Sequence, residues 1–176
     1  MTSDFQITAK NDAAPFTLKL HRGDGMSLLA MNWKTAKPPV DFVGFAIEYQ
    51  EPDGDRFFAL KNRVAFPSSE GDVNPNKMST RLSPIQKFRW VHFPRYAEKP
   101  GEFTYRVTPV FMNKFDELSY GEAQEAGIVL ARETYPGKLN VTFTRGFVSS
   151  QAFVDRYVTA TDGLETLIAP SADEGA

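Results

Sequence analysis

The chain of 176 residues contains no cysteine and only two histidines. Without cysteine, a disulfide framework, a thiolate metal site and a cysteine nucleophile are all excluded. His21 and His92 stand far apart in the sequence, and a lone pair without cysteine partners does not have the ligand spacing of a zinc site. We therefore predict no metal and no cofactor. The lack of cysteine is also typical of proteins from a reducing compartment.

Long apolar runs are missing as well. The first ten residues are polar and contain no apolar core of the kind found in a secretory signal. Elsewhere the apolar runs are far shorter than the roughly 20 residues that cross a bilayer. We expect a cytoplasmic protein that does not insert into membranes. Its formal net charge of −2 gives no overall attraction to nucleic acid or to an acidic membrane.

Aromatic residues, by contrast, are plentiful, with 15 Phe, 6 Tyr and 2 Trp. A chain of this length fits one domain, or one domain with a tail, and such a domain buries roughly 70% of its unfolded surface. The aromatic side chains supply enough apolar volume for a core, so we predict a globular fold that needs no covalent crosslink.

Short alternating segments, separated by Gly, Pro, Asn and Asp, dominate the pattern. The predicted strands cover residues 16–22, 26–33, 42–50, 56–60, 86–93, 103–112, 126–132 and 139–145. Regular spacing without intervening helical periodicity favours an all-β sandwich or barrel of about 7–8 antiparallel strands. The longest loop is expected between Pro67 and Pro84.

The sequence predicts four parts along the chain. Residues 1–15 form an N-terminal extension and residues 16–146 the β-sandwich. Residues 147–158 form a short helix, because Ser149 or Ser150 can cap it and because apolar residues recur at four-residue spacing. Residues 159–176 are rich in Thr, Asp, Gly, Pro and Glu, and we expect a tail or a linker to a following domain.

Three segments carry a resemblance to a fold family. Ser27–Trp33, a Pro-Pro loop and Gly44–Tyr49 resemble strands B and C of a fibronectin type III domain, and Phe103–Val110 resembles its strand F. The resemblance implies an immunoglobulin-like or fibronectin type III-like sandwich.

A narrower resemblance extends over most of residues 16–157. His21–Asp24 followed by Leu28–Ala30, Pro84–Trp90 and Phe143–Phe153 resemble the N-terminal region of bacterial phospholipase D-like proteins. The resemblance implies a sandwich that precedes phosphodiesterase domains in the same polypeptide.

The catalytic motif of that family is absent from this chain. It consists of His-x-Lys and, after four intervening residues, Asp, usually in two copies, with one His as nucleophile and the other as general acid. His21 is followed by Arg22-Gly23, and His92 by Phe93-Pro94, so neither begins the motif. No catalytic residue can be carried over, and we predict that this chain is not itself an enzyme.

Five short motifs have plainer explanations than chemistry. Asp53–Asp55 lacks the rest of a calcium loop and is predicted to be a hairpin turn. Ser149–Ser150 lies outside any nucleophile elbow, and Asp116–Glu117 is expected on a solvated loop. Arg22–Asp24 spells an integrin-binding tripeptide but is predicted to be a turn between strands. Asn140–Thr142 matches a glycosylation sequon, yet it falls in a predicted strand of a protein without a recognised signal.

Positive charge is concentrated in the middle of the chain. Residues 76–115 contain eight basic and two acidic residues, whereas the flanking segments are acidic. The basic residues are Lys77, Arg81, Lys87, Arg89, Arg95, Lys99, Arg106 and Lys114. Aromatic residues interleave with them.

Four residues of this segment form the candidate binding surface: Lys87, Arg89, Trp90 and Arg106. Strand alternation should send Lys87 and Arg89 to one face and Trp90 to the other. If Arg106 projects from an adjacent strand, the three cations form a stripe able to bind phosphates. The alternatives are a solvated outer face, charges that protect a sheet edge, and a surface that docks on an acidic neighbouring domain.

Three functions remain open from the sequence. The favoured one is a non-catalytic accessory module of a larger phospholipase D-like protein, which positions the catalytic domains or presents a substrate or partner. The second is a stand-alone module that binds an anionic polymer or a protein. The third is a hydrolase whose site is assembled from distant strands.

Overall fold

The computed structural model describes residues 5–62, 66 and 78–143. The chain divides after Phe143, and every described residue belongs to the first unit. Its strands are β1 (Gln6–Thr8), β2 (Phe16–Gly23), β3 (Met26–Trp33), β4 (Phe42–Gln50), β5 (Phe58–Ala59), β6 (Arg89–His92), β7 (Glu102–Met112), β8 (Leu118–Tyr120) and β9 (Gln124–Val129). No helix occurs among the described residues.

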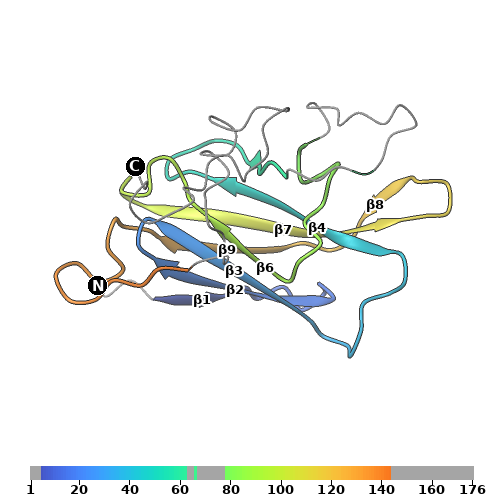
Figure 1. Ribbon diagram of the computed structural model, residues 1–176, viewed down its shortest axis with the longest axis horizontal. Coiled ribbons are helices and arrows are strands. Elements are labelled where there is room, and N and C mark those ends of the chain that lie inside the picture. The colour runs from blue at the N-terminus through green and yellow to red at the C-terminus, as the bar shows by residue number, and fades with distance from the viewer. Residues whose placement is uncertain (1–4, 63–65, 67–77, 144–176) are drawn as a thin grey trace, which may run out of the picture. The chain divides into compact units, whose positions relative to one another are not determined.

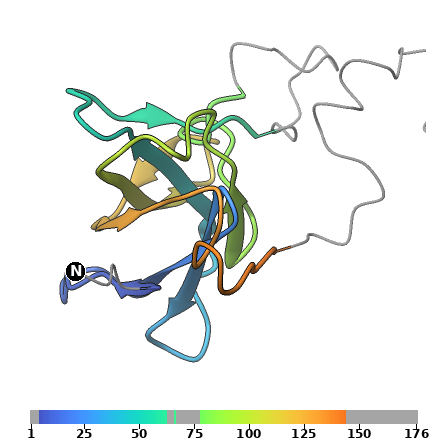
Figure 2. The same ribbon diagram turned by 90° about the vertical axis from the view of Figure 1, so that its left-hand side faces the viewer.

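The strands form two antiparallel sheets, which lie as two layers in Figures 1 and 2. The first sheet has the order β1-β2-β3-β6. The second has the order β5-β4-β7, and β8 and β9 both pair with the remaining edge of β7. The predicted all-β architecture is therefore confirmed at the level of two antiparallel sheets.

Alternation along the strands builds the core between the sheets. Phe16, Leu18 and Leu20 of β2 are fully buried, and so are Phe45 and Ile47 of β4. The predicted inward residues of β7 behave in the same way, because Phe103, Tyr105 and Val107 have no exposed surface. Each such side chain contributes about 1.5–3 kcal/mol through removal from water, so the core accounts for most of the driving force.

β8 and β9 continue one another along β7, with an interruption opposite a proline. Pro109 stands opposite Phe45 of β4. Because both backbone hydrogen bonds of Phe45 go to Ile85, the backbone groups of Pro109 point away from β4, toward β8 and β9, and on that side Pro109 has no N–H. There Pro109 can only accept, and its carbonyl takes the N–H of Gly121 at 3.0 Å. The missing donor explains why the ladder breaks between Tyr120 and Gln124.

The other edge of the second sheet is closed by a segment that is not a strand. Ile85 bonds to Phe45 in both directions, at 2.9 and 2.8 Å. This close approach depends on Gly44, whose φ is 137° and where a Cβ would lie 2.6 Å from the carbonyl oxygen of Ile85. The Thr80 hydroxyl then donates to the carbonyl of Ile47 at 2.8 Å and accepts its N–H at 3.1 Å. The Thr80 hydroxyl thus makes the two hydrogen bonds to Ile47 that the backbone of a neighbouring strand would otherwise make.

Residues 6–8, predicted to lie in an N-terminal extension over residues 1–15, instead form a strand of the first sheet. β1 pairs with β2, and the amide of Gln124 joins the two sheets beside it. Its Nε2 donates to the carbonyls of Asn11 (2.8 Å) and Phe16 (2.9 Å), and its Oε1 accepts the N–H of Asn11 at 3.0 Å. These bonds cover the edge of β9.

Two predicted strands were wrong in extent or in kind. Only Phe58–Ala59 of the segment 56–60 is a strand. The described part of 139–145 is irregular, because a turn pairs Tyr135 with Leu139 and because Val141 bonds to Asp24 instead of to a strand. The predicted helix over 147–158 and the tail over 159–176 lie outside the described residues. Within the described residues there is no helix of the length and apolar character needed to cross a membrane.

Candidate functional site

The four residues predicted to form one binding surface come from both sheets. Arg89 and Trp90 belong to β6 in the first sheet, and Lys87 precedes them, whereas Arg106 lies in β7 of the second. β6 pairs with β3 and not with β7, so the condition for a single stripe is not met. The prediction that Arg106 extends a stripe with Lys87 and Arg89 is wrong.

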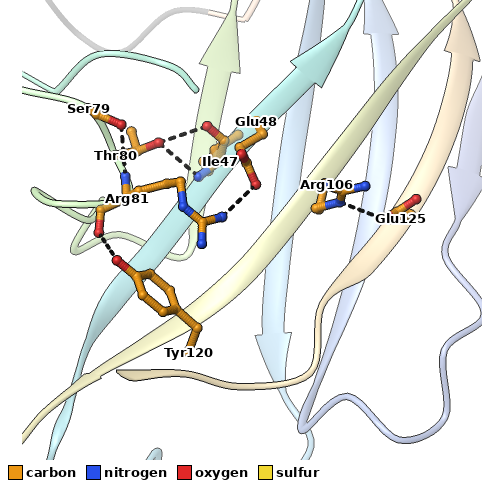
Figure 3. A network of polar contacts seen from close by, with 8 residues as sticks. All are labelled: Ile47, Glu48, Ser79, Thr80, Arg81, Arg106, Tyr120 and Glu125. Atoms are coloured by element: carbon orange, nitrogen blue, oxygen red, sulfur yellow. Dashed lines mark hydrogen bonds and ion pairs between the residues drawn. The ribbon is translucent and has the colours of Figure 1, made fainter. Parts of the chain in front are cut away.

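Arg106 is held in a row of alternating charges across the outer face of the second sheet (Figure 3). In the strand register Arg106 stands opposite Glu48 of β4 on one side and Glu125 of β9 on the other. Its Nε donates a hydrogen bond to the Glu125 carboxylate at 2.5 Å. Its guanidinium also lies over the Phe57 ring, 3.8 Å from the centroid. Neighbouring carboxylates therefore offset the charge that was expected to attract an anion.

Arg81 continues this row beyond Glu48. Its Nη1 lies 3.1 Å from the Glu48 carboxylate, whose side chain is only 10% exposed. The same guanidinium lies over the ring of Tyr120, and the Tyr120 hydroxyl donates to the Arg81 carbonyl at 2.8 Å (Figure 3). These contacts attach the segment around Thr80 to the sheet. Both arginines of the row, Arg81 and Arg106, have carboxylate partners, so the row has a structural role.

Of the two aromatic residues beside Lys87 and Arg89, Trp90 is partly buried against the core, whereas Phe88 is 40% exposed. Trp90 pairs with Leu29 and packs against the core, as alternation predicts. Phe88 lies over Phe42 and Phe45, with centroids 6.0 and 5.5 Å apart. Their main role is to close one end of the aromatic core.

A basic surface does exist, but its composition differs from the predicted one. Lys19 of β2 pairs with Ala30, and Ala30 pairs with Arg89, so the two cations share one row on the outer face of the first sheet. Lys87 lies two residues from Arg89 along the chain. Lys10 follows Ala9, which packs against the core, so alternation places Lys10 outside. We call Lys10, Lys19, Lys87 and Arg89, all exposed, the basic face.

His21 lies beside this face. Partial burial, followed by repulsion from Lys19, lowers the pKa of His21 below its usual value. The imidazole also meets the ring of Phe5 edge-on, with centroids 6.1 Å apart. Its neutral form is therefore favoured, and it adds no fixed charge to the basic face near neutral pH.

His92 occupies the interior side of β6. Its Nδ1 is 3.0 Å from the hydroxyl of Tyr105, and its ring lies 4.4 Å from that of Tyr49. Burial raises the pKa of Tyr105 well above the usual value for a phenol, and burial together with Glu51 raises that of Tyr49. Both tyrosines are thus held in the protonated form. They make poor general bases, and the cluster resembles a hydrogen-bonded core more than a catalytic site.

The tripeptide Arg22–Asp24 is not displayed as an adhesion motif. Arg22 is only 5% exposed. The Asp24 Oδ1 accepts three hydrogen bonds, from the hydroxyl of Thr134 (2.7 Å), its N–H (2.8 Å) and the N–H of Val141 (3.1 Å). The Thr134 hydroxyl, ahead of the two amides, lowers the pKa of Asp24 despite some opposing desolvation. This carboxylate holds the loop after β9 against the β2–β3 turn.

The remaining motifs have structural roles or lie outside the description. Asp53–Asp55 forms a turn in which the Gly54 N–H bonds to the Glu51 carbonyl at 2.9 Å, as predicted. Asp116–Glu117 lies in the β7–β8 turn and is exposed. Asn140 is exposed on irregular backbone, not in the predicted strand, and Ser149–Ser150 is not described. Among the described residues, no three His, Asp or Glu side chains gather as metal ligands.

The comparisons with known proteins give no family for this chain. No family model, no curated protein and no solved structure matches it.

Proposed function

We propose that this chain is a fibronectin type III-like sandwich that serves as a non-catalytic module of a larger phospholipase D-like protein. The order of the strands in the two sheets is the observation that supports the fold. Immunoglobulin-type sandwiches place strands A, B and E in one sheet and C, F and G in the other. β2, β3 and β6 share one sheet here, and β4, β7 and β9 share the second.

The segments that resemble strands B, C and F coincide with β3, β4 and β7. β5 pairs with β4 and so adds a strand at the C edge of its sheet. This agreement between sequence and pairing favours the fibronectin-like order over an unrelated two-sheet fold.

The use of the polar side chains supports a non-catalytic role. Asp24, Thr80 and Gln124 each bond to backbone groups of distant segments. His21 and His92 lie on opposite faces of the first sheet, because β2 and β6 present them on different sides. The family needs two histidines at one phosphate, so this sandwich would carry the catalytic domains without completing their site.

The reading frame beyond Ala176 in the gene tests the proposal. Two copies of His-x-Lys-x-x-x-x-Asp are expected there, and a stop codon would overturn it. A second measurement concerns chemistry: the purified chain should not hydrolyse bis(p-nitrophenyl) phosphate, whereas the longer protein should. Hydrolysis by the chain alone, lost on substitution of His21 or His92, would instead establish a hydrolase.

A further inference from the structure

The sheet geometry sets the spacing of the two central cations of the basic face. Lys19 and Arg89 stand in one row with Ala30 between them, which places their Cα atoms about 10 Å apart, since neighbouring strands are separated by roughly 4.8 Å. Lys87 precedes Arg89 by two residues, in the bend that leads into β6. The Met31 N–H donates to the Phe88 carbonyl at 2.8 Å and carries the register on past Arg89.

No carboxylate occurs among the residues that the described strands place on this outer face. Those residues are Gln6, Thr8, Thr17, Lys19, His21, Gly23, Met26, Leu28, Ala30, Asn32, Arg89 and Val91. Met26 and Val91 are buried, and Val141 and Phe143 lie against Gly23, so the exposed cations stand on the rest of this face. The ion pairs seen in the described part of the chain use Arg81, Lys99, Arg106 and Arg132 instead. The chain carries a net charge of −2, so this concentration of cations is local and not a consequence of overall composition.

The residue types on the face distinguish between kinds of partner. Protein interfaces have a centre rich in aromatic residues and poor in lysine. Here the central row holds Lys19 and Arg89, and Trp90 of β6 packs against the core. Surfaces that bind nucleic acid are more polar and much more positive. Phe88 beside them is 40% exposed but packs on Phe42 and Phe45, so the face offers one partly covered ring and not the series of rings on which a single strand stacks its bases.

We infer that the basic face binds the phosphodiester backbone of a nucleic acid duplex without reading its base sequence. The cations meet phosphates as charge-assisted hydrogen-bond donors, and binding is driven by release of counterions from the duplex. Thr8, Thr17 and Asn32 surround them as neutral donors and acceptors. The inference rests on the face alone and does not require the proposed downstream domains.

Salt dependence gives a quantitative test with this chain as it exists. Fluorescence anisotropy of a labelled 20-base-pair DNA duplex is measured between 50 and 200 mM KCl. With four phosphate contacts, log K should fall against log [KCl] with a slope of about −3.6, a loss of roughly 150-fold over this range. The K19Q/R89Q variant should show a slope of about −1.8 and lose only about 12-fold, in addition to weaker binding at 50 mM.

A matched variant separates local from overall charge. Lys114→Gln together with Lys138→Gln removes the same two charges at exposed positions outside the face, and the slope should stay at about −3.6. Urea midpoints of both variants check that they fold. Duplexes of A·T and of G·C pairs should bind equally.

His21 reports where the duplex binds. Burial and, as the smaller cause, repulsion from Lys19 lower the pKa of His21. A phosphate bound near Lys19 offsets the repulsion, so this pKa, measured by NMR, should rise when duplex is added. No duplex binding at 50 mM KCl, equal slopes for the two double variants, or an unchanged His21 pKa would each overturn the inference. Binding to poly-glutamate or to phosphatidylglycerol vesicles without binding to duplex would do the same.

Discussion

Thr80→Val should lower the free energy of unfolding because it leaves the backbone N–H of Ile47 without a partner. The hydroxyl of Thr80 is fully buried and bonds to both the N–H and the carbonyl of Ile47. Valine keeps the shape but removes the hydroxyl. The Ile47 carbonyl retains a second partner, the N–H of Leu60 at 2.9 Å, so the loss falls on the Ile47 N–H.

The magnitude follows from that single unpaired donor. A buried group left without a partner costs about 1–3 kcal/mol, so we expect the free energy of unfolding to fall by about 2 kcal/mol. Thr80→Ser keeps the hydroxyl and removes one methyl group, for which we expect about 1 kcal/mol.

Equilibrium urea unfolding measures both changes. With an m-value of about 2 kcal/mol/M, the Thr80→Val midpoint should drop by about 1 M and the Thr80→Ser midpoint by about half as much. The account is contradicted if the free energy of unfolding of Thr80→Val lies within about 0.5 kcal/mol of the wild-type value, or if Thr80→Ser is less stable than Thr80→Val. In either case the hydroxyl would not stabilise the fold by bonding to the backbone of Ile47.

Three further changes test other contacts. Gly44→Ala should lower the free energy of unfolding by more than about 2 kcal/mol in urea, because the new Cβ meets a backbone carbonyl; Gly137→Ala, also at positive φ but with nothing nearby, should cost about 1 kcal/mol, and equal losses would contradict this account. Arg106→Glu creates a row of three acidic residues and should cost about 1 kcal/mol at 20 mM NaCl and less at 500 mM; a loss independent of salt would point to packing instead. The lowered pKa of Asp24 means that its hydrogen bonds stabilise the fold above the carboxyl's unfolded pKa and are lost as pH falls through the folded one, so Asp24→Asn should unfold more easily than wild type at pH 7 and the difference should shrink below about pH 4; a constant difference would refute the assignment.

The strand pattern was predictable where one face of a strand packs on the core. In β2 the apolar residues Phe16, Leu18 and Leu20 alternate and are buried, and Phe103, Tyr105 and Val107 of β7 do the same, whereas the middle of β4 is buried on both faces. β1 and β8 have three residues each, too few for alternation to appear. Leu139, Val141 and Phe143 alternate like a strand, but Asp24 binds the backbone of Val141, a tertiary contact that the local pattern does not contain.

The candidate surface was predictable only in part, because a count of charged residues along the sequence finds only cations that are close in sequence. That comparison found Lys87 and Arg89, which are close in sequence. Lys19 reaches Arg89 through the pairing of β2, β3 and β6, which is set by the fold. An available signal was the outward position of Lys19 in the alternating segment 16–22, combined with a topology that places this strand and β6 in one sheet.

The attachment of the loop after β9 to the β2–β3 turn determines how mechanical force enters the sandwich. Val141 bonds to Asp24 through its N–H (3.1 Å) and its carbonyl (2.8 Å). Val141 lies between β9 and Phe143 along the chain, so this attachment comes first when the chain is followed back from Phe143. A pull applied beyond Phe143 would therefore load the first sheet at the turn before it could strip β9 from β7. In single-molecule stretching, Asp24→Asn should lower the force of the earliest rupture and leave the main unfolding event in place.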